Sequence, residues 1–170
     1  LDNLRYSRAY LTAANGTAEY RRSKAPTLLD TRQTAVKAGV ARHSELRKDW
    51  NEADREVRKN AEDLSKVKVE KLAHLQNQYI DLERRSIILN ELGTARAQIN
   101  GAEKDGAKKK APQTLKTAQL DFATAEAVIS TNARNPENYQ NAVMKANQSA
   151  RMLSDVMATI AASGAKKLPE

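Results

Sequence analysis

The sequence predicts an all-α protein, an elongated rod of two tandem antiparallel three-helix bundles that share one long central helix. Three observations lead to this fold class. The composition favours long helices, and the stretch from Asp49 to Lys110 contains no proline and reads as a single helix. The pattern of the chain also repeats after 86 residues, the distance from Pro26 to Pro112.

The composition of the 170-residue chain is typical of a helical protein. It contains only six Gly and four Pro, and 29% of its residues are charged. Aromatic residues make up 4% of the chain, which is less than the core of an α/β enzyme of this size normally holds. Small residues at regular spacing let helices approach closely, as they do in helical bundles.

The chain has no cysteine, which excludes disulfides, thiolate catalysis and cysteine-based metal sites. No apolar run approaches the roughly 20 residues that span a membrane, and the sequence contains no signal peptide. Because the chain begins at Leu1 without methionine, we expect a mature product or an excised fragment.

Residues 1–24 are predicted to form the first helix. Aromatic and small side chains recur there at spacings of four and three residues, which places them on one helical face. The helix should end before Pro26, because the residue that precedes a proline avoids the α region. The face consists of Tyr6, Tyr10, Ala13, Thr17 and Tyr20.

The second helix is predicted over residues 26–47. Pro26 suits its first turn, where the missing N–H group costs nothing. Ala35 and Gly39 are small enough for a close contact between helices. The predicted buried face consists of Leu29, Val36 and Val40, with His43 at its margin.

Asp49 is the predicted N-cap of the long helix, in a capping-box-like pair with Glu52. The apolar stripe of this helix slips near Lys68 and shifts again at Ile88, which suggests that the helix changes packing partners. The stripe consists of Ala53, Val57, Ala61, Leu64, Leu72, Leu75, Tyr79 and Leu82, followed by Ile88, Leu92, Ala95, Ile99 and Ala102.

Two more helices are predicted over residues 112–132 and 136–163. Asn135 supplies an N-cap and Pro136 a first helical residue, and Gly164 ends the last helix. The stripes of both helices alternate strictly between spacings of three and four. They consist of Leu115, Ala118, Phe122, Ala125 and Ile129, and of Tyr139, Val143, Ala146, Ala150, Leu153, Met157 and Ile160.

The second half of the chain repeats the first at an offset of 86 residues without a gap. The offset aligns the two Ala–Pro pairs, and it also aligns the two predicted N-caps, Asp49 and Asn135. Because both the helix-end signals and several core positions agree, the sequence predicts an internal repeat. Further pairs are Leu29 with Leu115, Thr31 with Thr117, Gln33 with Gln119, Val36 with Phe122 and Val57 with Val143.

The repeat divides the chain into two three-helix units, residues 1–85 and 86–164, and leaves a frayed tail over residues 165–170. The third helix of the first unit continues as the first helix of the second, which explains the shift of its stripe. This architecture is spectrin-like, although no spectrin motif is present. We expect modest stability for each unit, because the seams are narrow and rich in alanine.

The formal net charge of +8 is compatible with a nucleic acid, an anionic lipid or an acidic protein as partner. The charges are mostly interspersed, as in Glu45–Asp49 and Asp54–Lys59. This pattern is typical of a solvated helix face and is favoured over a nucleic-acid-binding stripe.

Two basic clusters immediately precede the two Ala–Pro pairs. One interpretation makes them contact points for anions or a partner. The other, which we favour, is that they stabilise helix C-termini, an effect of about 0.3–1 kcal/mol. The clusters consist of Arg21, Arg22 and Lys24, and of Lys108, Lys109 and Lys110.

No constellation for catalysis, a cofactor or a metal ion emerges from the sequence. The two histidines, His43 and His74, fall on different predicted helices and have no ligand partners at suitable spacing. Phosphate-binding loops, HExxH and GxSxG motifs are missing. Trp50 is expected to pin the turn before the long helix, with a partner contact as the alternative.

Residues 106–118 (GAKKKAPQTLKTA) resemble a helical domain of unknown function. That domain occurs in Gram-negative envelope lipoproteins and ahead of OmpA-like peptidoglycan-binding domains. The shared pattern is a Gly-Ala pair, an Ala-Pro pair, Leu and Ala at helical spacing, and a later helix with a tyrosine, here Tyr139. The likeness covers about residues 88–160 and recurs weakly in 9–65, where Tyr20-Arg21 replaces the Gly-Ala pair.

The resemblance implies a periplasmic protein associated with the outer membrane. It also implies a signal-bearing or lipidated N-terminus upstream of Leu1 and an OmpA-like domain downstream of Glu170. The family has no assigned catalytic residues, so the resemblance assigns none here.

We therefore expect a non-enzymatic spacer or docking module that links an outer-membrane anchor to peptidoglycan or a protein partner, with no small-molecule substrate. The alternative is a basic nucleic-acid-binding or coiled-coil protein of the cytoplasm, with steeply salt-dependent affinity for DNA or RNA. A homo-oligomer formed through Ile80, Ile87 and Leu89 is also open.

Overall fold

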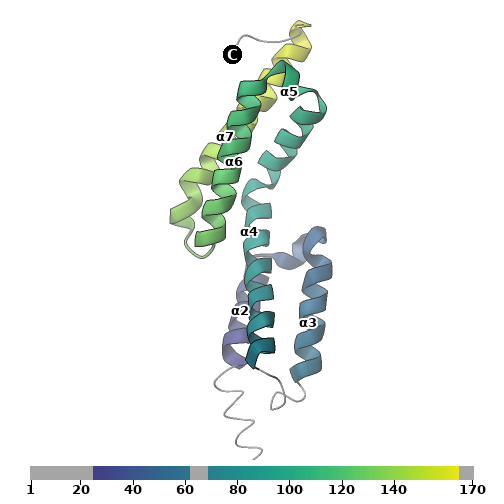
Figure 1. The fold of residues 1–170 in the computed structure, drawn as a ribbon, viewed down its shortest axis with the longest axis vertical. Helices are drawn as coiled ribbons and strands as arrows, with labels where there is room; N and C mark the ends of the chain where they lie inside the picture. Colours follow the sequence, from purple (N-terminus) through teal and green to yellow (C-terminus); the bar gives the residue numbers. More distant parts are fainter. Residues whose placement is uncertain (1–24, 62–68, 165–170) are drawn as a thin grey trace, which may run out of the picture. The chain divides into compact units, whose positions relative to one another are not determined.

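A computed structural model describes residues 25–61 and 69–164, and every regular element in these ranges is a helix (Figure 1). The predicted all-α class is confirmed for this part of the chain. None of the described helices is long and apolar enough to cross a membrane. The predicted first helix, residues 1–24, and the predicted tail, residues 165–170, lie outside the described residues.

The chain divides into two compact units at Ser86 and Ile87. This boundary lies inside α4, which contributes to both units. In chain order the helices are α2 (Ala25–Lys37), the 3-10 turns η1 (Val40–Arg42) and η2 (Ser44–Leu46), α3 (Arg47–Ala61), α4 (Val69–Lys104), α5 (Ala107–Lys110), α6 (Pro112–Asn132) and α7 (Pro136–Ser163).

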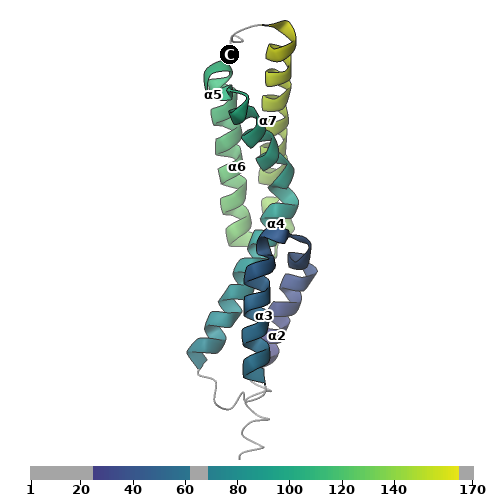
Figure 2. The ribbon, with the colours of Figure 1, turned by 90° about the vertical axis from the view of Figure 1, so that its right-hand side faces the viewer.

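The single helix predicted over Asp49–Lys110 is wrong. Within the first unit α3 and α4 run antiparallel (Figure 2). Two ion pairs show the direction: Lys71 near the start of α4 pairs with Glu56, whereas Arg85, further along α4, pairs with Asp49 near the start of α3. The sequence between α3 and α4 contains no glycine or proline that would predict the reversal. It lets both helices bury their apolar faces against each other, which a straight helix would leave exposed.

The C-terminal part of the predicted long helix is interrupted as well. α4 ends at Lys104, and the chain turns at Asp105 and Gly106 before the short helix α5. Gly106 has a φ of +87°, a left-handed conformation that other residues rarely adopt. The left-handed conformation of Gly106 therefore interrupts the helix, which the long-helix prediction did not include.

The prediction of one helix over residues 26–47 is also wrong in its second half. α2 ends at Lys37, and Gly39 has a φ of +85°. A left-handed glycine of this kind terminates helices. After the two 3-10 turns, α3 begins at Arg47, so Asp49 lies within the first turn and is not the N-cap.

The buried face of α2 differs from the predicted one. Leu29 is 54% exposed and Val36 is 41% exposed, although Val40 is buried as predicted. Because adjacent residues of a helix point about 100° apart, a shift of one position changes the face. The side chains of α2 that are buried belong to Leu28, Thr31 and Ala35.

The 86-residue repeat therefore aligns unlike environments at some positions. Leu29 is exposed, whereas its counterpart Leu115 is 4% exposed. Thr31 is buried, whereas Thr117 is exposed. The residue types agree at these positions, but α2 and its counterpart α6 do not bury the same face.

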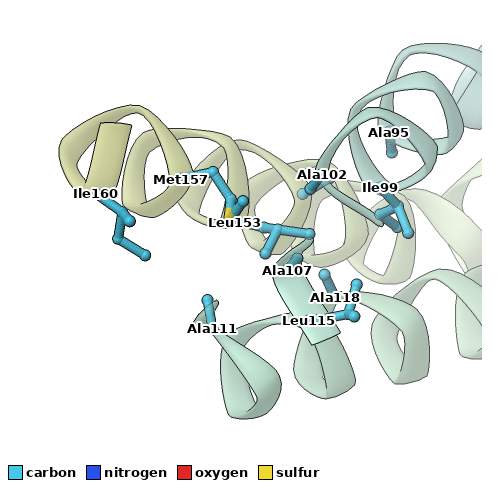
Figure 3. Close-up of a cluster of buried hydrophobic side chains, with 11 residues drawn as sticks. Ala95, Ile99, Ala102, Ala107, Ala111, Leu115, Ala118, Leu153, Met157 and Ile160 are labelled. Carbon is cyan, nitrogen blue, oxygen red and sulfur yellow. The ribbon is translucent and has the colours of Figure 1, made fainter. Parts of the chain in front are cut away.

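The stripes predicted for the second unit are confirmed, and Figure 3 shows part of the core that they form. All seven predicted positions on α7 are buried, and so are four of the five on α6, with Phe122 half-buried. Alanines face larger side chains from neighbouring helices, which brings the helices close together. One core cluster holds Ala95, Ile99, Ala102, Ala107, Ala111, Leu115, Ala118, Ala150, Leu153, Met157 and Ile160.

The ends of α6 and α7 are also where the sequence predicts them. Pro112 and Pro136 are the first residues of α6 and α7. Gly164 has a φ of +65° and closes α7. Asn135 has the N-cap position of α7, but its side chain makes no capping hydrogen bond.

Two glycines lie inside α4 at positions where alanine should stabilise the protein. A Cβ added to Gly93 or Gly101 meets no atom within 4 Å. Replacing either residue by alanine should therefore raise the free energy of unfolding by about 0.5–1 kcal/mol, because alanine has the higher helix propensity. Urea unfolding of the two variants measures the change.

Gly106→Ala is the matched control, because the φ of +87° at this position strains any residue with a Cβ. We expect this variant to be less stable than the parent protein. A loss of stability in Gly93→Ala and Gly101→Ala similar to that in the control would contradict the continuity of α4.

Candidate functional site

One carboxylate joins the three α-helices that the structure describes in the first unit. Arg32 of α2 donates from Nε and Nη2 to the two oxygens of Asp54 on α3, both at 2.8 Å. Tyr79 of α4 donates its hydroxyl to Asp54 Oδ1 at 2.8 Å. Together with Trp50 these residues form what we call the Asp54 cluster, which ties α2, α3 and α4 through charged hydrogen bonds.

Trp50 lies beside both donors to Asp54. The guanidinium of Arg32 is 5.1 Å from the Trp50 ring centroid, within the range of a cation–π contact. Tyr79 meets Trp50 edge to face, with ring centroids 5.5 Å apart. These contacts place Trp50 between α2 and α4, and not at the turn that it was expected to pin.

The electrostatics of the Asp54 cluster keep its charges in place. Burial favours a higher pKa for Asp54, but hydrogen bonds from Arg32 and Tyr79 outweigh burial and hold the pKa below its usual range. Burial, reinforced by the bond to Asp54, raises the pKa of the Tyr79 hydroxyl. Near neutral pH the carboxylate is charged and the phenol is neutral, so neither group is poised for proton transfer.

A second carboxylate links two helices of the second unit. Asp121 of α6 is 5% exposed. Ser149 of α7 donates to its Oδ2 at 2.5 Å, and Lys145 Nζ lies 2.9 Å from its Oδ1. The bond from Ser149, together with Lys145, keeps the pKa of Asp121 below its usual value despite desolvation. Among the described residues, both units thus contain a largely buried aspartate bonded across helices.

The structure places only one of the two predicted basic clusters. Lys108, Lys109 and Lys110 form the last three residues of α5, a helix of four residues. They do not follow the end of the long helix directly, because α4 ends at Lys104 before an intervening turn. Lys108 Nζ lies 3.6 Å from Glu103. The other cluster, Arg21, Arg22 and Lys24, lies outside the described residues.

A groove of about 590 Å³ lies among α4, α5 and α7 of the second unit. Its walls are mostly small side chains, and Asp105 and Lys110 contribute opposite charges. Ser154 is the only lining residue with a hydroxyl, and it donates to the carbonyl of Ala150 at 3.2 Å. The complete lining is Gln98, Gly101, Ala102, Asp105, Lys110, Ser154, Met157, Ala158 and Ala161.

The described residues offer no metal centre and no unsatisfied recognition group. Within ranges 25–61 and 69–164, no three side chains of His, Asp or Glu gather closely enough to hold a metal ion. Every buried side-chain nitrogen or oxygen in these ranges has a hydrogen-bond partner. The buried polar side chains of this part of the chain are therefore satisfied within the protein.

Sequence reasoning did not identify the Asp54 cluster. Its members come from three helices, and their association depends on the reversal between α3 and α4. One signal was present: Tyr79 falls on a buried apolar stripe, and a buried tyrosine hydroxyl usually needs a polar partner. That signal points to a partner without saying which residue it is.

Comparison with known proteins finds no match to a family model, a curated protein or a solved structure. The resemblance of residues 106–118 to an envelope domain stays a prediction.

The Asp54 cluster predicts a measurable loss of stability. Asp54→Asn removes the charge that Arg32 and Tyr79 bind. Hydrogen bonds to charged groups contribute about 1.5–3 kcal/mol, so the free energy of unfolding of the first unit should fall by about that amount. Fluorescence of Trp50, the one tryptophan of the chain, monitors the urea unfolding.

Asp81→Asn is the control for this prediction. The side chain of Asp81 is 61% exposed and lies 3.4 Å from Arg85, and an exposed ion pair of this kind contributes about 1 kcal/mol or less. Equal losses in the two variants would show that Asp54 makes no special contribution.

The same carboxylate predicts a pH dependence. A carboxyl whose pKa is lower in the folded protein stabilises the fold above the unfolded pKa, about 3.9 for aspartate. This stabilisation is lost as the pH falls through the folded pKa. Stability followed by Trp50 should therefore decline below about pH 4, and the decline should be smaller in Asp54→Asn. Identical acid profiles would contradict the role of Asp54.

Proposed function

We propose that this chain is a non-enzymatic helical module that acts as a spacer or docking element. The observation that carries the proposal is the continuity of α4, which runs for 36 residues and contributes to both units. A helix of this length extends about 54 Å at 1.5 Å per residue. Such an element suits a protein whose task is to hold other parts at a distance.

The transfer of α4 from one unit to the next leaves no exposed linker. Ser86 is fully buried in the first unit, where its hydroxyl donates to the carbonyl oxygen of Ala38 at 2.7 Å. Ile88, two residues later, is buried in a core cluster of the second unit. We propose from this that two bundles share α4 as a spectrin-like, elongated tandem.

The chemistry of the described residues supports a structural role over catalysis. Asp54 and Asp121 are held ionised by donors on neighbouring helices. Ser154, the hydroxyl of the groove, is bonded to the backbone of its own helix. An activated nucleophile requires a lowered pKa or a base that accepts its proton, whereas Ser154 donates to a carbonyl oxygen and the pKa of Tyr79, the hydroxyl beside Asp54, is raised.

The proposed setting is the periplasm of a bacterial cell envelope, in association with the outer membrane. There the module would link an outer-membrane anchor to peptidoglycan or to a protein partner. The support for this setting is the resemblance of residues 106–118 to a domain of envelope lipoproteins.

Small-angle X-ray scattering of the full chain tests the elongated tandem. A compact protein of this length has a radius of gyration of about 15–16 Å. The proposal predicts a value well above that, because two bundles arranged in tandem along α4 make a particle longer than α4 itself, which spans about 54 Å. A value near that of a compact particle, with a near-spherical distance distribution, would reject the spacer role.

A further inference from the structure

The groove among α4, α5 and α7 is bordered by small side chains of both long helices. Gly101 and Ala102 contribute to it from α4, and Ala158 and Ala161 contribute from α7. A Cβ added to Gly101 meets no atom within 4 Å, so the groove is open at this point. Because small side chains let helices approach closely, the groove suits the packing of one more helix.

Two opposite charges in the groove have no charged partner in the same chain. Asp105 and Lys110 both belong to the lining, yet neither side chain forms an ion pair with another described residue. Their neighbours differ, because Lys108 lies 3.6 Å from Glu103. A helix that occupies the groove should therefore carry one charge of each sign at the corresponding end.

α7 itself presents such a face to solvent. The exposed face consists of Arg151, Asp155, Ala158 and Ala162, at helical spacings of four and three. Arg151 and Asp155 are the only charged residues of α7 beyond Lys145. Neither of them forms an ion pair within the described part of the chain. This face of α7 therefore complements the groove in size and in charge.

The directions of the helices determine which charges would meet. Asn147 of α7 donates to the carbonyl oxygen of Glu91 on α4 at 3.2 Å. Asp105 and Ala161, which line the groove together, have the same separation in sequence as that pair. α4 and α7 therefore run in the same direction along the groove. An additional α7 that runs antiparallel to both would bring its charged residues to the end of the groove that contains Asp105.

We propose that the groove is one half of a symmetric homodimer interface, in which α7 of each copy lies antiparallel in the groove of the other. A two-fold axis near Ala158 places Asp155 of the second copy beside Lys110. Arg151 of the second copy lies about one turn further along, towards Asp105. In such an isologous dimer every contact occurs twice. The inference goes beyond the proposed function and does not depend on it.

The size of the face indicates how stable the dimer should be. From Arg151 to Ala162 the exposed face of α7 extends about 17 Å. This length places the contact at the small end of protein interfaces, where association is transient. We therefore expect monomer and dimer to exchange in solution. The interface is distinct from the surface of Ile80, Ile87 and Leu89 that the sequence leaves open for an oligomer.

Analytical ultracentrifugation of the full chain, from about 10 µM to 1 mM, tests the dimer. The parent protein should show a reversible monomer–dimer equilibrium. Lys110→Asp and Asp155→Lys should each raise the dissociation constant about tenfold or more, because each substitution places two pairs of like charges in the interface. Far-ultraviolet circular dichroism should show unchanged helix content in both variants.

An equimolar mixture of the two variants provides the decisive measurement. The heterodimer contains one pair of Lys110 with Asp155 and one pair with both charges reversed, so the mixture should dimerise like the parent protein. A purely structural effect of either substitution would not be rescued by mixing. Lys116→Asp is the matched control, since Lys116 is exposed on α6 outside the groove, and this variant should keep the parent's dissociation constant.

Ala158→Glu tests the two-fold axis separately. Ala158 is exposed, so the variant should fold, and two glutamates brought together at the axis should abolish the dimer. A parent protein that stays monomeric over the whole concentration range would overturn the proposal. So would a dimer that survives Ala158→Glu or both charge reversals, or a mixture of the two charge variants that stays monomeric.

Discussion

α4 has to bury one face in the first unit and another in the second, and the rest of the structure depends on this constraint. The change occurs between Ser86 and Ile88, which point about 200° apart on a helix. Ser86 is fixed by a hydrogen bond to Ala38, and Ile88 by packing against apolar side chains of α6 and α7. Because one continuous helix contributes to both units, we expect that a loss of packing in one unit affects the stability of the other.

Narrow seams explain why charged groups appear between the helices. Alanine occupies many of the buried positions of the second unit, and each alanine removes little apolar surface from water. Asp54 and Asp121 add charge-assisted hydrogen bonds between helices at the places where they are shielded from solvent. Such bonds stabilise only when the carboxylate is fully partnered, and both aspartates meet that condition through at least two donors.

The long stripes of the second unit could be predicted because several independent signals agree there. Each stripe repeats over several turns, and Pro112, Pro136 and Gly164 mark the helix ends by known backbone chemistry. The tertiary packing of these helices agrees with the helices that the local sequence favours. This agreement extends to the apolar positions of α4, which are buried on both sides of the unit boundary.

The first unit resisted prediction because its decisive features are either ambiguous or non-local. Gly39 fits both a close helix contact and a left-handed helix end, and the structure selects the second. The reversal between α3 and α4 has no glycine or proline to mark it. Once the reversal was missed, the contact of Asp54 with Tyr79 could not be foreseen, since it exists only when α3 and α4 lie side by side.

The central claim is that α4 couples the folding of the two units, and urea unfolding followed by two probes tests it most directly. Trp50 fluorescence reports the first unit, and far-ultraviolet circular dichroism reports all helices. We predict coincident transitions for the parent chain and separate ones after insertion of two glycines between Ser86 and Ile87. The same insertion between Ala133 and Arg134, outside the helices, should preserve coincidence. Separate transitions in the parent chain, or coincident ones after the insertion in α4, would contradict the coupling.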